Sequence, residues 1–220
     1  MVYYNPATMY LVKEPSISVT LNAYQYRTYK NYNALGLNQN LSGSDFSTLP
    51  NMIAGILAPS KHPKVRFGYN VLSKNDVTNS FNLLISKRID AVQSTAGMEN
   101  FVGSFNYFMH SSEYWAGLGL GLELSKHVSF GLSHFGIYRS MKYSNTYDFR
   151  ALPEDYSTGD VTSLSSNIAF NYYSVKGLIK PALSLHYNRF RAGLTYTSPT
   201  FHLFGKGSFY REFSIINMDE

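Results

Sequence analysis

YWAGLGLGLELSKHVSFGLSHFGIY, residues 114–138, is the stretch that decides the fold class. Apolar residues recur at every second position from Tyr114 to Leu124, which is the period of a β-strand. The polar break at 125–127 has the length of a hairpin turn, and a second alternating run begins at Val128. Two runs of about ten residues with one continuous apolar face are typical of a transmembrane β-hairpin. A hairpin of a soluble β-sandwich is the alternative, but its strands are usually about five or six residues long.

Three glycines, Gly117, Gly119 and Gly121, lie on the other face of the first run. Glycine weakens the interior of a strand and usually marks a bend or a close approach. We therefore expect this face to be a crowded or strongly curved inner wall.

The composition agrees with a membrane barrel. Aromatic residues make up 16% of the 220 residues and charged residues only 15%, against about a quarter charged in typical globular domains. Tyrosine enrichment fits the aromatic girdles at membrane interfaces. Cysteine is absent, which excludes thiol chemistry and disulfides. The net charge is +5 but the basic residues are scattered, so no nucleic-acid partner is expected.

Alternating segments along the whole chain predict an all-β fold, an antiparallel transmembrane β-barrel with about nine or ten strands in this sequence. Polar segments at 30–49, 73–79 and 139–167 are interpreted as loops, and Ser111-Ser112 as a tight joint. The predicted strands are residues 16–29, 50–58, 64–72, 81–88, 101–108, the two runs of the 114–138 hairpin, 173–187 and 190–196.

The predicted connections differ in length on the two sides of the sheet. Those near residues 60, 126 and 188 are short, and those near 40 and 150 are long. This asymmetry is typical of outer-membrane barrels, which have short periplasmic turns and longer extracellular loops. The joint at 111–112 and the connection at 89–99 do not follow the pattern.

Both ends of the sequence look incomplete. The first residues, MVYYNP, have no signal-peptide pattern, and the chain stops at Met218-Asp219-Glu220 without an obvious final strand. Because a barrel cannot leave open edges in lipid, we expect a fragment. We divide it into a short N-terminal segment, residues 1–14, and a barrel, residues 15–220, that is incomplete at its C-terminus.

Asn5-Pro6-Ala7, immediately before the first predicted strand, resembles the NPA motif in the hatch of FadL/TodX-type (OMPP1) outer-membrane transporters. More of the chain agrees in order and spacing, and the likeness covers most of the 220 residues. Thr8 departs from the pattern, since many members carry glycine there. The similar segments are SISVTLNAYQY (16–26), LPNMIAG (49–55), GLGLGLELSKHVSFGLS (117–133) and RAGLTYTSPTF (191–201).

The resemblance implies a barrel of 14 strands, an even number as in most bacterial barrels, plugged by an N-terminal hatch in the bacterial outer membrane. Such proteins move long-chain fatty acids or other hydrophobic compounds. Asn5, Pro6 and Ala7 are then hatch residues. A kink in the third strand accompanies a lateral opening in the family, and Gly68 is the candidate position for it here.

The large apolar residues Leu72, Leu84, Phe108, Trp115 and Phe135 share the predicted inner face with Ser, Asn and Gly. They are interpreted either as packing under the hatch or as an apolar path for a ligand. One of four cations is expected to pair with a carboxylate head group or to be solvated in the lumen: Arg66, Arg88, Lys176 or Lys180. The candidates for the lumen or the ligand are Arg66, Leu72, Phe108, Trp115 and Phe135.

Catalytic and metal motifs are weak. The glycines of 117–121 lack GxGxxG spacing, and the six histidines show neither HxxxH nor HExxH. Ser133-His134 and Ser184 have no GxSxG elbow around them. We expect no enzyme activity, no cofactor and no metal.

The sequence thus predicts passive outer-membrane transport of a hydrophobic small molecule such as a long-chain fatty acid, with outer-membrane lipid around the barrel. The alternative is an outer-membrane barrel that transports nothing and serves as a scaffold or in protein export. A soluble β-rich protein is a third interpretation, supported by the absent signal peptide.

Overall fold

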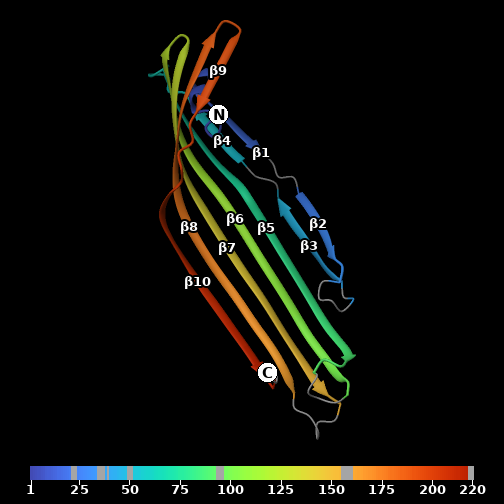
Figure 1. The fold of residues 1–220 in the computed structure, drawn as a ribbon. Coiled ribbons are helices and arrows are strands. Elements are labelled where there is room, and N and C mark those ends of the chain that lie inside the picture. Colours follow the sequence, from blue (N-terminus) through green and yellow to red (C-terminus); the bar gives the residue numbers. More distant parts are fainter. Residues whose placement is uncertain are drawn as a thin grey trace.

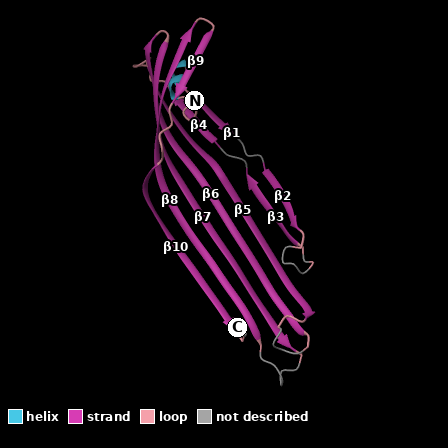
Figure 2. Ribbon diagram, viewed as in Figure 1, coloured by secondary structure: helices cyan, strands magenta, loops and turns pink. Residues whose placement is uncertain are grey.

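The computed structural model describes residues 1–20, 24–33, 38, 40–48, 52–92, 97–154 and 161–217. Nearly all of them belong to antiparallel strands (Figures 1 and 2). The elements in the described residues are the 3-10 helix η1 (Pro6–Leu11) and the strands β1 (Ser16–Thr20), β2 (Tyr24–Asn31), β3 (Leu41–Thr48), β4 (Met52–Leu57), β5 (Val65–Ile89), β6 (Glu99–Ser125), β7 (Val128–Pro153), β8 (Thr162–Tyr187), β9 (Phe190–Thr195) and β10 (Phe201–Ile216).

The strands follow chain order across one large sheet, β1-β4-β5-β6-β7-β8-β10, with β9 also paired to β8. β2 and β3 form a separate ladder that continues the lines of β1 and β4, beside β5 (Figure 1). The large sheet is strongly curled into a half-barrel. The N-terminal segment, residues 1–14, lies against its concave face, where η1 contacts β5, β6, β7 and β8.

The two faces of the sheet can be followed through the ladders, because residues directly opposite each other on neighbouring strands share a face. Trp115 of β6 pairs with Ile137 of β7, and Leu118 pairs with His134. We call the face of Trp115 and Ile137, which meets the N-terminal segment, the inner face. The face of Leu118 is the outer face.

The structure confirms an all-β antiparallel sheet and corrects its connections. Most of the predicted loops are strand: β3 lies within 30–49, β5 runs through 73–79, and β7 and β8 take up most of 139–167. The expected joint at Ser111-Ser112 lies inside β6. The predicted strand start at Pro50 falls outside the described residues.

These corrections place the longer connections together at one end of the sheet, although 58–64, with seven residues, is only one residue shorter than 154–161. The short connections at 58–64, 126–127 and 188–189 lie at the end that carries the N-terminal segment, as Figure 1 shows. The longer connections at 32–40, 90–98 and 154–161 lie at the opposite end. Asn188, with φ of 51°, has the left-handed backbone that suits a two-residue hairpin turn.

The predicted absence of a strand near the C-terminus is wrong, because β10 covers Phe201–Ile216. β9 and β10 lie in line along β8, interrupted at Ser198-Pro199. Ser198 keeps the edge bonded there: its N–H donates to the carbonyl of Ile179 at 3.0 Å, and its hydroxyl accepts from the N–H of Ile179 at 3.0 Å. Proline has no N–H to donate, so it is tolerated at this irregular position.

Candidate functional site

The Asn-Pro-Ala motif begins η1. The Oδ1 of Asn5 accepts the N–H of Ala7 at 2.9 Å, which is the bond of an N-cap residue. Pro6 occupies the first helical position, where a missing N–H costs nothing. The hydroxyl of Thr8 donates to the carbonyl of Asn5 at 2.8 Å. The motif therefore sets the direction in which residues 6–11 cross the inner face.

Ala7 is completely buried against β7. The main chain of Pro6 and Ala7 fills the space that a side chain at Gly131 would occupy. Glycine at 131 is thus required by the close approach of η1 to the wall. Gly119 and Gly121 face Met9 in the same contact, so the crowded wall predicted for this face is present.

Side chains of the wall hold the main chain of the N-terminal segment. Ser129 Oγ donates to the carbonyl of Ala7 at 2.9 Å, and Ser133 Oγ donates to that of Val2 at 2.9 Å. Lys180 Nζ donates to the carbonyl of Tyr3 at 3.0 Å. All three donors are buried, which makes these bonds difficult for water to replace.

Three of the predicted lumen residues, Leu72, Trp115 and Phe135, are buried in one cluster with Val2 and Met9. The ring of Tyr3 meets those of Trp115 and Phe135 edge-on, at centroid distances of 5.8 and 6.0 Å. Their geometry is that of packing under the N-terminal segment.

Arg66 is also buried at this contact. Its Nε donates to the carbonyl of Val12 at 2.8 Å, and its Nη1 donates to the carbonyls of Pro63 and Val65, each at 2.8 Å. Arg66 therefore ties the end of the N-terminal segment to the turn before β5. It is placed to position main chain, and it does not face the open part of the concave surface.

No register shift occurs at Gly68, the candidate position for a kink. Gly68 pairs regularly with Ile56 and Gly119, and Met9 and Val2 cover it. The register of β5 shifts instead between Ser73 and Asn75. Such a bulge leaves one residue unpaired and re-aims its side chain. Here the residue is Lys74.

Lys74 lies directly beyond the N-terminal segment on the inner face. Its Nζ is 4.2 Å from the ring centroid of Trp115 and 3.8 Å from Glu113 Oε1, which also accepts Trp115 Nε1–H at 2.7 Å. Arg139 and Lys176 share the inner face at this level, by their pairing with Glu113 and Ile137. Lys74, Arg139 and Lys176, together with Glu113, thus form a predominantly cationic layer next to the N-terminal segment, which we call the floor.

A row of aromatic rings crosses the inner face above this floor. The rings of Tyr29, Phe81, Tyr107, Tyr143 and Phe170 follow one another at centroid distances of 4.8, 5.4, 5.6 and 4.7 Å. All five side chains are half-buried. Sequence reasoning missed this row because it placed these residues in separate strands or in loops. Continuing the two-residue period upward from Trp115 to Tyr107 would have found it.

The far end of the inner face is apolar as well. A cavity of about 220 Å³ lies beside the stacked rings of Phe101 and Phe149, which are 5.7 Å apart. Ala91, Val92, Ala151 and Leu164 complete its apolar lining.

The outer face changes character along the strands. From Leu124 to Tyr114, and at the paired positions of β5, β7 and β8, it is mainly apolar, with Leu118 70% exposed; the polar exceptions are Ser73, opposite Tyr114, and His134, opposite Leu118. The change falls at the tyrosines Tyr114, Tyr138 and Tyr173. The apolar band covers ten residue steps of β6, about 34 Å along the antiparallel strand or about 24 Å at a 45° tilt. Beyond it the outer residues are mainly Ser, Thr, Asn and charged.

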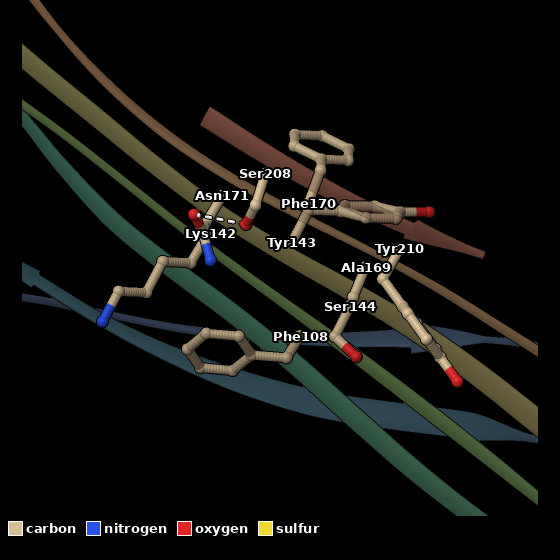
Figure 3. Close-up of a pocket in the computed structure, with 9 residues that line it drawn as sticks. All are labelled: Phe108, Lys142, Tyr143, Ser144, Ala169, Phe170, Asn171, Ser208 and Tyr210. Carbon is tan, nitrogen blue, oxygen red and sulfur yellow. Dashed lines mark hydrogen bonds between the residues drawn. The ribbon is translucent and has the colours of Figure 1, made fainter. Parts of the chain in front are cut away.

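Phe108 and Leu84 lie on this outer face and not on the inner face, which corrects their predicted positions. β6 pairs with β7 in one register from Glu99 to Glu123, so Phe108 shares a face with Leu118. Figure 3 shows Phe108, Lys142 and Tyr210 on one side of the strands and the stacked rings of Tyr143 and Phe170 on the other.

The hydroxyls considered as nucleophiles are buried at the contact with the N-terminal segment. Ser184 Oγ is 3.0 Å from His186 Nε2, and the ring of Tyr10 packs 5.4 Å from that of His186. Burial raises the pKa of the Tyr10 phenol; the Glu123 carboxylate adds to this and Arg191 opposes it. Tyr10 is therefore neutral at neutral pH. No group of three metal-ligating side chains occurs in the part of the chain that the structure describes.

The fold and the site define a class: a curled antiparallel sheet whose concave face is covered at one end by the N-terminal segment. No family model, curated protein or solved structure matches the chain significantly. Among the described residues, no helix has the length and apolar character needed to cross a membrane.

Proposed function

We propose that the protein is an outer-membrane β-barrel of the FadL/TodX type that lets hydrophobic compounds, such as long-chain fatty acids, pass inward without covalent chemistry. The outer apolar band supports membrane insertion. Its height of about 24 Å agrees with the apolar belt of about 25 Å on outer-membrane barrels. The tyrosines at its edge, Tyr114, Tyr138 and Tyr173, resemble an interfacial aromatic girdle.

The aromatic row on the inner face is the observation that carries the transport proposal. A water-filled pore has a polar lumen, whereas here half-buried rings extend from Tyr29 to Phe170. The cavity at Phe101 and Phe149 continues the apolar surface to the far end of the strands. An apolar molecule entering at this end would meet the rings of Phe101 and Phe149 first and the aromatic row next.

The floor below the row supports a ligand with an anionic end. Lys74, Arg139 and Lys176 share the inner face there with Glu113 as the paired acid. A carboxylate reaching this level gains charge-assisted hydrogen bonds, while its chain remains against the rings. Below the floor, the N-terminal segment closes the lumen and must move for the ligand to pass.

Uptake by intact cells tests the proposal. The full chain is produced in a Gram-negative host that lacks its own fatty-acid transporter, and initial uptake of radiolabelled oleate is measured. We expect wild-type protein to restore uptake. Replacing both Phe81 and Tyr107 with Ala should reduce the uptake rate at least about tenfold. The reason is that a loss of about 1.4 kcal/mol of binding free energy, from the contacts of these two rings, lowers the affinity for the ligand tenfold.

A matched control replaces two apolar residues of the same strands that face outward, Leu84 and Val102. This double variant should transport like wild type. A heat-dependent shift in gel mobility verifies that every variant is a folded barrel. Wild-type protein that shows the shift but takes up neither oleate, an alkane nor toluene would reject transport and favour the scaffold alternative.

A further inference from the structure

A second hollow lies on the outer face, a short way beyond the tyrosines that end the apolar band. It has a volume of about 270 Å³ (Figure 3). One register row crosses it: Phe108 of β6, Ser144 of β7, Ala169 of β8 and Tyr210 of β10. The two rings stand at the ends of the row and the two small residues lie between them. The shape is a trough about three strand spacings wide, or about 14 Å.

The adjacent row supplies polar groups. Lys142 pairs with Asn171, and Asn171 pairs with Ser208, whose hydroxyl donates to Asn171 Oδ1 at 3.0 Å. Lys206 lies one step closer to the apolar band, opposite Tyr173. The trough therefore combines aromatic walls with amide, hydroxyl and ammonium groups.

The charge balance of the trough is positive. Neither Lys142 nor Lys206 forms an ion pair within the described residues. The neighbouring acids are engaged: Glu212 accepts the hydroxyl of Tyr210 at 2.6 Å, and Asp76 accepts that of Tyr114 at 3.2 Å. An anionic ligand would thus meet two available cations.

We propose that this trough binds the phosphorylated sugar head group of the glycolipid that forms the outer leaflet, lipopolysaccharide. The inference rests on the membrane insertion in the proposed function, and it does not require transport. With the apolar band in the bilayer and the longer connections outside, the trough lies at the level of the outer-leaflet head groups. Hexose rings stack on aromatic side chains such as Phe108 and Tyr210, and phosphates pair with lysines.

Binding of purified lipopolysaccharide to the full chain in detergent tests this proposal. Affinity is measured by titration with lipopolysaccharide that carries phosphorylated lipid A, and again after enzymatic removal of the phosphates. A lysine close to an anionic membrane surface contributes about fivefold in affinity. Replacing Lys142 and Lys206 with Ala together should weaken binding about 25-fold, and dephosphorylation should weaken wild-type binding to a similar degree.

The control variant is Arg150→Ala, on the outer face of β7 eight positions beyond Lys142, where Arg150 pairs with Asp148 at 3.0 Å. It should bind like wild type. A second variant, Phe108→Ala with Tyr210→Ala, should lose affinity for phosphorylated and dephosphorylated lipopolysaccharide alike. Equal affinities for wild type and the lysine variant, or no effect of phosphate removal, would overturn the proposal.

The heat-dependent mobility shift separates this inference from the proposed function. Protein that shows the shift and takes up oleate but does not bind lipopolysaccharide overturns the inference alone. Phosphate-dependent binding by protein that takes up no hydrophobic compound overturns transport alone. Protein without the shift overturns both.

Discussion

The same four long strands carry opposite chemistry in two parts of the sheet. In the part that the N-terminal segment covers, near Gly131 and Leu118, the outer face is mainly apolar. The inner face there presents small and hydrogen-bonding residues to the segment, beside the buried cluster of Trp115 and Phe135. In the projecting part, near Tyr107 and Leu84, the outer face is mainly polar and the inner face carries the aromatic row. The polarity of each face therefore changes along a single strand. We infer that the surroundings of the strand change at the position where the polarity of the outer face changes.

The largest expected effect compares one substitution on the two outer faces. Leu118→Arg should destabilise the folded barrel by about 2–4 kcal/mol, because Leu118 lies near the centre of the apolar band. Leu84→Arg should change stability by less than about 0.5 kcal/mol, because Leu84 is 82% exposed in the projecting part. The measurement is urea unfolding of the protein in phospholipid vesicles. Equal costs at the two positions would show that the change in outer-face polarity does not mark a membrane boundary.

An intermediate effect concerns the inner face of the part that the N-terminal segment covers. Gly131→Ala places a methyl group where the main chain of Ala7 lies, and overpacking of this kind costs about 1–3 kcal/mol. The N-terminal segment should then exchange its amide hydrogens faster, as measured by mass spectrometry. Gly136→Ala, whose added carbon has its nearest neighbour at 3.9 Å, is the matched control on the same strand. Faster exchange in the control as well would mean that β7 itself is loosened.

The smallest expected effect concerns the start of η1. Asn5→Ala removes the acceptor for the Ala7 N–H and should reduce the free energy that holds the segment on the wall by about 1 kcal/mol. Asn5→Ser keeps an acceptor and should retain most of that amount. The same exchange measurement applies, with the aromatic row of the projecting part as the internal reference. Faster exchange in the strand residues of the aromatic row, as well as in the segment, would show that the two parts are one cooperative unit.

Much of the fold could be predicted where one face of a strand is apolar. Residues 114–138 and 173–187 alternate without interruption, and both regions are strand. Prediction failed for 73–79 and 139–167, because a strand with a polar outer face and mixed inner residues has the composition of a loop. The bulge at Lys74 added to this, since it reverses the phase of β5 and interrupts the alternation.

The part of the candidate site that the N-terminal segment covers was predictable from the sequence, and the part with the aromatic row was not. Trp115 and Phe135 were expected either under the hatch or along a ligand path, and their contacts with Tyr3 favour the packing alternative. Phe108 was assigned to the wrong face because the phase was restarted at an assumed joint at Ser111-Ser112. The face of a residue depends on strand continuity, which no local pattern reveals.

The wall holds the N-terminal segment chiefly through carbonyl oxygens, those of Val2, Tyr3, Ala7 and Val12. Every residue type carries that acceptor. Substitutions in the segment therefore leave these four bonds available as long as the new side chain fits, whereas each donor on the wall is a particular side chain that cannot be exchanged freely. The wall residues that donate these bonds are therefore expected to tolerate fewer substitutions than the residues of the segment that they hold.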